Sequence, residues 1–303
     1  MKPASRFENF PPYTPIEPYE ILSKRLGRPI DQIVKLDANE NPYGPSPQAL
    51  KALAELEFTH IYPDPESLAL RAALAEFTGV SMDDLLCGAG ADELIDLLIR
   101  VLIEPGEAII TCPPTFSMYA FDGLLNAAAV IEIPRRADFS LDIESIIQAV
   151  KTYSPKILFL TTPNNPDGNL LSREEITVLL ELPVLVVLDE AYIEFTAQGG
   201  ALGEKQTMIR AVSKRENLVV LRTFSKWAGL AGLRVGYGAF PEWIMPTLWK
   251  AKQPYNINVA ASAAAIASLG NLGFLADNVA SIRSERDRLY NLLDAIPYLD
   301  PFP

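Results

Sequence analysis

Apolar runs that alternate with helical patterns occupy most of the chain between about residues 35 and 250. The runs at 156–162, 182–188 and 218–221 are rich in β-branched and large apolar residues, and each is followed by a polar segment. Continuous apolar runs are typical of strands buried on both faces of a parallel sheet. Separated by helices, such strands form βαβ units. The pattern therefore predicts an α/β fold with a mostly parallel central sheet and helices on both faces.

The chain has 303 residues, more than one modest core usually holds. We expect an N-terminal arm with one helix over residues 1–34, a large domain over 35–252, and a linker helix with the start of a small C-terminal domain over 253–303. The arm carries prolines at Pro11, Pro12, Pro15 and Pro18. Its helix is predicted from Pro18 to Leu26, and a helix of small residues is predicted to begin at Ala260.

Lys226 follows the run at 218–221, so we place it at the end of a strand, where open α/β sheets bind ligands. Burial among Phe224, Trp227 and Leu230 would disfavour the ammonium form and lower the pKa of the amine. A neutral amine is a nucleophile, and such lysines bond covalently to carbonyl cofactors. A lysine after a serine is more often a solvated residue at a helix start, so this hypothesis depends on the neighbouring motifs.

Two segments are suited to binding a phosphate. Ser225 can donate its hydroxyl, and Arg234 can clamp two phosphate oxygens. The glycine-rich turn at 86–90 precedes a predicted helix, and the backbone amides of Ala91 and Asp92 at its start would face an anion. A glycine-rich turn alone is weak evidence. Together with a reactive lysine, however, a phosphate site indicates pyridoxal phosphate (PLP).

Polar residues that suit the PLP ring follow the other two runs. Asp189 ends the run at 182–188, and its carboxylate could keep the ring nitrogen protonated. Tyr192 is placed to donate its phenol to the ring hydroxyl. Asn165 precedes Pro166, which favours an extended backbone and an amide that points into the crevice. Asp189 could instead cap a helix, and the Asn-Pro pair is unremarkable as a turn.

Composition excludes several other classes of protein. The net charge of −12 argues against a nucleic-acid partner, because phosphates require a basic face. No run approaches the roughly 20 apolar residues of a membrane helix, and the first residues lack a signal-peptide core. We expect a cytoplasmic protein. Cys87 and Cys112 are predicted to be free buried thiols, and a single histidine, His60, makes a metal site implausible.

Three further segments carry recognisable motifs: LDANENPYGPS at 36–46, YPDP at 62–65 and CPPTFSMY at 112–119. Together with the lysine, aspartate, asparagine and glycine-turn motifs, they resemble the fold-type I PLP-dependent aminotransferases, and specifically the histidinol-phosphate aminotransferase family. The resemblance runs from about Leu36 to the end of the chain. It implies the fold-type I architecture, a large PLP-binding domain followed by a small domain.

The resemblance also implies roles for residues around the ring. Lys226 would form a Schiff base with PLP and shuttle the substrate proton. Asp189 would pair with the ring nitrogen, while Asn165 and Tyr192 would contact the ring oxygen. Phe116 occupies the position of the aromatic residue that stacks on the ring, although it lacks the hydroxyl of the tyrosine common there, which preserves stacking and removes one hydrogen bond.

By the same resemblance, Ser225, Arg234, Ala91 and Asp92 would hold the phosphate. Tyr43 would reach the cofactor phosphate of a partner subunit, which implies a homodimer.

The family's reaction would take an amino donor and a 2-oxo acid, here L-histidinol phosphate and 2-oxoglutarate in histidine biosynthesis. Imidazole acetol phosphate and L-glutamate would be the products. The motifs leave open an aromatic amino acid aminotransferase and a phospho-threonine decarboxylase. They also leave open a protein that binds PLP without catalysis, such as the aminotransferase-like half of a transcription regulator or a truncated product.

The sequence departs from the family in two further places. Asp167 stands where threonine is usual, in a turn that we do not expect to contact the ring. The sequence stops at Pro303, before the small domain that supplies an arginine for the substrate, so we expect an incomplete small domain and can name no such arginine. The charged stretch Arg283 to Arg288 is interpreted as a solvated helix face.

Overall fold

The fold comes from a computed structural model, which describes residues 1, 3, 4, 7, 10, 12, 16–196 and 201–302. Pro11 and Pro15 of the predicted arm lie outside the described residues.

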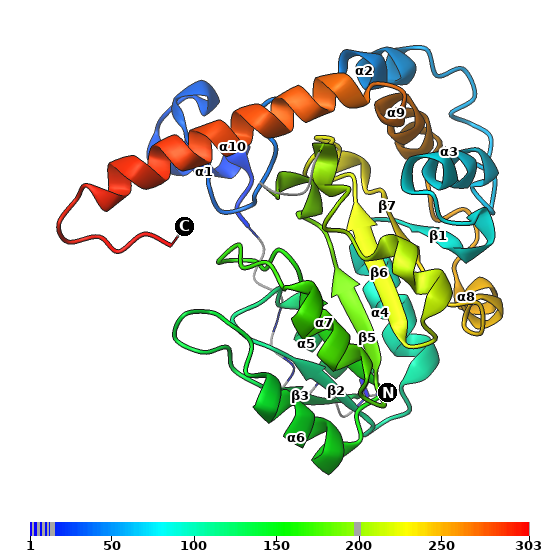
Figure 1. The fold of residues 1–303 in the computed structure, drawn as a ribbon. Coiled ribbons are helices and arrows are strands. Elements are labelled where there is room, and N and C mark those ends of the chain that lie inside the picture. The colour runs from blue at the N-terminus through cyan, green and yellow to red at the C-terminus, as the bar shows by residue number, and fades with distance from the viewer. Residues whose placement is uncertain are drawn as a thin grey trace.

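A seven-stranded sheet forms the centre of the molecule (Figure 1). Its strands are β1 (Leu85–Gly88), β2 (Ala108–Thr111), β3 (Ala129–Glu132), β4 (Ile157–Thr161), β5 (Leu185–Asp189), β6 (Leu218–Thr223) and β7 (Gly236–Ala239). Their order across the sheet is β1-β7-β6-β5-β4-β2-β3. Only β7, among the described strands, runs against its neighbours β1 and β6. The pairs from β6 to β3 are parallel, which confirms the predicted α/β class.

Helices lie on both faces of this sheet (Figure 1). The helices of the described residues are α1 (Tyr19–Leu26), α2 (Pro47–Ala54), α3 (Leu68–Thr78), α4 (Ala91–Leu102), α5 (Met118–Leu125), α6 (Ile143–Tyr153), α7 (Arg173–Leu180), α8 (Met245–Ala251), α9 (Val259–Leu269) and α10 (Leu272–Asp294). The predicted arm helix begins one residue later than expected, with Pro18 as its N-cap. A proline is favourable there because it has no amide hydrogen that the helix would use.

Two hydrophobic cores form because alternate residues of each strand point to opposite faces. In β5, Val186 and Leu188 join the core beneath α3, α6, α7 and α9. Leu185 and Val187 join the second core, beneath α4, α5 and α8. Burial on both faces explains why the strand sequences are apolar without alternation. It also fixes the register of each strand, so the residue after each run emerges at a defined point on the sheet edge.

The long helix α10 lies on the side of the molecule toward which β5 and β6 point (Figure 1). It has 23 residues and follows the small-residue helix α9, which begins at Val259 as the sequence predicted to within one residue. Among the described residues, no single helix is long and apolar enough to cross a membrane. The pair α9 and α10 meets that criterion by length and composition alone, with an 85° bend between the two helices.

Cys87 and Cys112 are buried and unpaired, as predicted. Burial raises the pKa of both thiols to about 12, so neither is a thiolate at neutral pH.

Candidate active site

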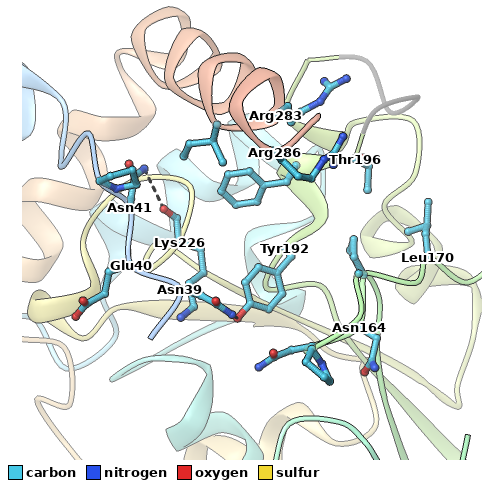
Figure 2. A pocket seen from close by; sticks show the side chains of 17 residues that line it. Asn39, Glu40, Asn41, Asn164, Leu170, Tyr192, Thr196, Lys226, Arg283 and Arg286 are labelled. Carbon is cyan, nitrogen blue, oxygen red and sulfur yellow. Dashed lines mark hydrogen bonds between the residues drawn. The ribbon is translucent and has the colours of Figure 1, made fainter. Parts of the chain in front are cut away.

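A cavity of about 710 Å³ opens where the parallel strands end. Figure 2 shows that its walls come from distant parts of the chain: the segment 39–42, the turn 163–168 after β4, Tyr192 after β5 and Lys226 after β6. The carboxyl ends of parallel strands meet at one sheet edge, so residues far apart in sequence converge there. Of the predicted site residues, Lys226, Tyr192 and Asn165 line this cavity.

Lys226 projects from the loop after β6 into the cavity (Figure 2). Its Nζ donates a hydrogen bond to the backbone oxygen of Ala38, at 3.1 Å. Burial lowers the pKa of this amine, while the negative charges of Asp92 and Glu40 oppose the shift. Phe224, which precedes it by two residues, is fully buried, in agreement with the expected apolar surroundings. The amine is therefore more easily neutral than that of an exposed lysine.

The segment 36–46 packs directly onto the lysine loop. Asn41 donates from its Nδ2 to the backbone oxygen of Lys226 at 3.1 Å (Figure 2) and to that of Trp227, also at 3.1 Å. Its neighbour Asn39 donates to the phenol oxygen of Tyr192 at 3.1 Å. Burial raises the pKa of Tyr192, so this phenol stays protonated near neutral pH. The N-terminal motif thus orients two of the residues that line the cavity.

Asp189 is the last residue of β5 and is only 3% exposed. One carboxylate oxygen accepts from the hydroxyl of Tyr119 at 2.7 Å, and the other accepts from the backbone amide of Ala191 at 3.0 Å. Burial raises the pKa of Asp189 to about 6, against the lowering effect of these hydrogen bonds. Phe116 packs edge-on against Tyr119, with ring centroids 5.5 Å apart. Neither Asp189 nor Phe116 is part of the cavity wall.

The predicted phosphate site lies at the start of α4. The helix begins at Ala91, after Gly90 with φ 86°, a conformation that favours glycine. An Nη2 atom of Arg234 contacts the carboxylate of Asp92 at 2.7 Å. A Cβ on Gly236 would lie 2.6 Å from the backbone nitrogen of Ala91, so β7 approaches the helix start closely only because this residue is glycine.

The remaining two predicted residues occupy different surroundings. Ser225 is 7% exposed, and its hydroxyl accepts a hydrogen bond from Thr223 at 2.9 Å. Tyr43 is 48% exposed and lies outside the cavity wall. Its backbone amide donates to the side chain of Asn41 at 3.0 Å, which ties its position to the lysine loop.

One sequence interpretation is only partly right. Residues 284–288 of α10 are exposed, as expected of a solvated face, but Arg283, which is half-buried, and Arg286 also line the cavity (Figure 2). Residues three apart share one side of a helix, and α10 crosses the cavity with that side inward. Which side of α10 lines the cavity depends only on how the helix packs in the folded protein. The sequence offered no signal beyond the spacing of the two arginines.

Sequence reasoning also missed Tyr119, Asn39 and Asn41, although all three lie inside the quoted motifs. Tyr119 ends the segment 112–119, three residues after Phe116, and the spacing places both on one side of α5 and its preceding turn. Its proximity to Asp189 depends on strand pairing and was not visible from the spacing.

Comparisons with known proteins identify the family of this chain. Residues 31–303 match the family of aminotransferases class I and II. The chain is 55% identical over 292 residues to the chloroplastic histidinol-phosphate aminotransferase of Nicotiana plumbaginifolia, covering 96% of this chain and 69% of that protein. It is 50% identical over 297 residues to the histidinol-phosphate aminotransferase of Roseiflexus castenholzii, covering 96% of this chain and 78% of that protein.

A solved structure has the same architecture. The histidinol-phosphate aminotransferase from Sinorhizobium meliloti, in complex with pyridoxal-5'-phosphate, superposes with a TM-score of 0.84 at 28% identity. The match covers 96% of this chain and 78% of that one. With a family match over residues 31–303 and close relatives of one kind, the chain belongs to the class I and II aminotransferases, in the group of histidinol-phosphate aminotransferases.

Proposed function

We propose that this protein is a PLP-dependent aminotransferase that transfers the amino group of L-histidinol phosphate to 2-oxoglutarate. Imidazole acetol phosphate and L-glutamate would be the products, in histidine biosynthesis. The name shared by the relatives supports this amino donor. The observation that carries the chemistry is the position of Lys226, a half-buried amine with a lowered pKa at the wall of the cavity.

The residues present fit PLP. Backbone amides at the start of α4, Ser225 and Arg234 form a set of donors suited to a phosphate, and Gly236 lets β7 pack closely against the start of that helix. Asp189, Tyr192 and Asn165 would hold the ring, and Lys226 would bind the cofactor covalently. When bound, PLP supplies an electron sink for charge that develops on the substrate's α-carbon.

Lys226 would act as the base that takes the proton from the α-carbon. The task requires a neutral amine, and burial shifts the pKa of Lys226 in that direction. The backbone oxygen of Ala38 accepts from Nζ at 3.1 Å, so a hydrogen-bonded position for the amine already exists beside the cavity. Asn41 holds the backbone of the same loop and limits its movement.

Asp189 would supply the negative charge opposite the ring nitrogen. A buried carboxylate is costly without partners, and its two hydrogen bonds from Tyr119 and Ala191 offset part of that cost. A protonated ring nitrogen would add a positive charge and lower the pKa of Asp189 further. Tyr192, already held by Asn39, would present its phenol to the ring oxygen.

We further propose a homodimer in which Tyr43 reaches the cofactor phosphate of the partner subunit. The exposure of Tyr43 outside the cavity of its own chain supports this role. The cytoplasmic location and the division into an arm, a large domain and a small domain stay predictions. The relative from Nicotiana plumbaginifolia carries the word chloroplastic in its name, so membership of the group does not set the location.

Borohydride reduction of the protein with PLP tests the proposal, because it fixes a cofactor bound through a lysine to that side chain. Peptide mapping should find the modification on Lys226. Lys226→Arg should remove both the modification and the visible absorbance of the bound cofactor. The matched control is Lys252→Arg, since burial also lowers the pKa of Lys252, which lies outside the cavity. Modification at another lysine, or none, would refute the assignment.

A further inference from the structure

We propose that Tyr119 is a positioning residue for the reaction. Its hydroxyl keeps the Asp189 carboxylate ionised and fixes its orientation. The inference rests on the proposed function, because it takes Asp189 as the partner of the cofactor ring. It adds a residue that neither the motifs nor the relatives' names assign.

The ring of Tyr119 is held rigidly. Tyr119 is fully buried in α5. Its ring stacks on Phe159 of β4, with centroids 4.9 Å apart and planes 6° from parallel. Phe116 packs against it edge-on, at 5.5 Å. Aromatic contacts on two sides fix the ring plane and therefore the position of the hydroxyl, which lies 2.7 Å from Asp189.

The hydroxyl belongs to a chain of hydrogen bonds that runs away from Asp189. The Tyr119 oxygen lies 2.8 Å from the Thr161 hydroxyl, which lies 3.1 Å from the Thr115 hydroxyl. Thr115 in turn donates to the side-chain oxygen of Asn164 at 2.9 Å. Asn164 cannot donate back along this chain, because the atom that faces Thr115 is its amide oxygen; its Nδ2 donates to the backbone oxygen of Pro114 at 3.0 Å and to the carboxylate of Asp167.

The number of hydrogens along this chain links the donor pattern to the charge of Asp189. Three hydroxyls, on Tyr119, Thr161 and Thr115, must supply the contacts from Asp189 to Asn164. If the Asp189 carboxyl is ionised, it supplies no hydrogen, and one hydroxyl contact is left without one. If it is protonated, every contact has a hydrogen. The contact between Thr161 and Thr115, at 3.1 Å, is the longest of the four, and it is the one that would lack a hydrogen when Asp189 is ionised and Thr161 donates to Tyr119.

Tyr119 can act as a donor over the whole working pH range. Its burial and the nearby charge of Asp189 raise its pKa well above the usual value of a phenol. It therefore stays protonated when Asp189 ionises. The hydrogen bond from Tyr119 lowers the pKa of Asp189, which burial alone would hold higher. Without this donor, the carboxyl would be protonated at a higher pH and would offer the ring a neutral partner.

Other charged and titratable groups also face Asp189. Asp92 on α4 raises its pKa, and Lys226 lowers it. The negative charge of Asp189 also raises the pKa of Tyr192 and of Glu190, which lie on the loop after β5. None of the four donates a hydrogen bond to the carboxylate, whose partners are Tyr119 and the backbone amide of Ala191. Among the described residues, Tyr119 is thus the one side chain that donates a hydrogen bond to the Asp189 carboxylate. This bond both favours the ionised form and fixes the orientation of the carboxylate.

Tyr119→Phe tests the proposal, because it removes only the hydroxyl and keeps both ring contacts. The first measurement is the titration of Asp189 in the cofactor-free protein, followed by its infrared carboxyl band and identified with Asp189→Asn. The pKa should rise by about one to two units, the effect of losing one hydrogen bond to a charged group. Tyr153→Phe, at an exposed tyrosine on α6, is the matched control and should not shift it.

The second measurement is steady-state kinetics of the PLP-loaded enzyme. The Tyr119→Phe variant should lose roughly tenfold in kcat with the KM for the amino donor changed less than about twofold, as expected for an interaction needed in the transition state. An unchanged Asp189 pKa together with an unchanged kcat would overturn the proposal. A fall in kcat with no change in pKa would also overturn it, since Tyr119 would then act by another route.

Thr161→Val keeps the inference testable if Tyr119→Phe does not fold. It removes the hydroxyl beside Tyr119 and should shift the Asp189 pKa upward by a smaller amount, and no shift would contradict the role. The outcome is separable from the proposed function. Wild-type protein that develops no visible absorbance with PLP would end the proposed function, whereas the Asp189 titration needs no cofactor.

Discussion

Arg234 and Asp92 form an ion pair at the start of α4, with an Nη2 to Oδ2 distance of 2.7 Å. Both belong to the predicted phosphate site, so the guanidinium of Arg234 already pairs with a carboxylate there. A phosphate that binds there must share Arg234 with Asp92 or displace it. The backbone amide of Asp92 favours the anion, whereas its side chain opposes it.

Asp92→Asn should therefore tighten PLP binding. The substitution removes the competing charge and retains the backbone amide, and we expect the dissociation constant to fall roughly threefold, the scale of a partly exposed ion pair. The gain should shrink as salt rises. Fluorescence titration with PLP measures it. Asp96→Asn, on the same helix but paired with Arg100, is the control. Weaker binding in the Asp92 variant would show that its side chain helps to hold the site.

Gly236→Ala, on β7, should weaken the phosphate site by displacing the start of α4. An added Cβ would lie 2.6 Å from the Ala91 nitrogen and 2.7 Å from the Gly90 carbonyl carbon, both backbone atoms, so the start of α4 must move. We expect a loss of roughly 1–3 kcal/mol in stability by thermal unfolding. PLP binding should weaken about tenfold, equivalent to about 1.4 kcal/mol.

Gly232→Ala is the matched control, because a Cβ there has no atom within 4 Å. Equal effects of the two substitutions would contradict the importance of the close approach between β7 and α4.

Asp122→Asn should change how stability depends on pH. Burial, and then the charges of Asp96 and Asp92, raise the pKa of Asp122 to about 7. Since the unfolded chain has a pKa of about 3.9 there, the folded protein binds more protons between these values. The protonated Asp122 carboxyl therefore makes its whole contribution to stability below about pH 4, and this contribution is lost as the pH rises to about 7.

The variant should remove this slope and be more stable than wild type at pH 8 by roughly 1–3 kcal/mol. Denaturant unfolding at pH 5 and pH 8 measures both quantities. Asp31→Asn, at an exposed position, should leave them unchanged. A variant that is less stable at pH 8 would indicate that the Asp122 carboxylate is favourably paired.

Strand ends were predictable from the sequence because burial on both faces leaves a direct signal. The apolar runs before Lys226 and Asp189 identified β6 and β5, and their polar residues then had to emerge at one edge. β7 left no such signal, since Gly236–Ala239 contains two glycines in four residues. Its antiparallel place between β1 and β6 depends on close backbone approach, which a sequence pattern does not report.

The parts of the site that escaped prediction depend on how elements pack. Arg283 was taken for a solvated residue because charges alternate around it, yet α10 turns it toward the cavity. Tyr119 was quoted within a motif but had no role, because its contact with Asp189 requires α5 to lie against the end of β5. Local periodicity carries information about burial, whereas side-chain partners across elements depend on tertiary placement.

The most direct test of the central claim is the visible absorption of the protein with PLP, before and after an amino donor is added. L-Histidinol phosphate should convert the band of the lysine-bound cofactor to the shorter-wavelength band of the aminated cofactor, and 2-oxoglutarate should restore it. L-Phenylalanine and O-phospho-L-threonine should leave the band largely unchanged. Absence of any band, or faster conversion by L-phenylalanine than by L-histidinol phosphate, would contradict the account.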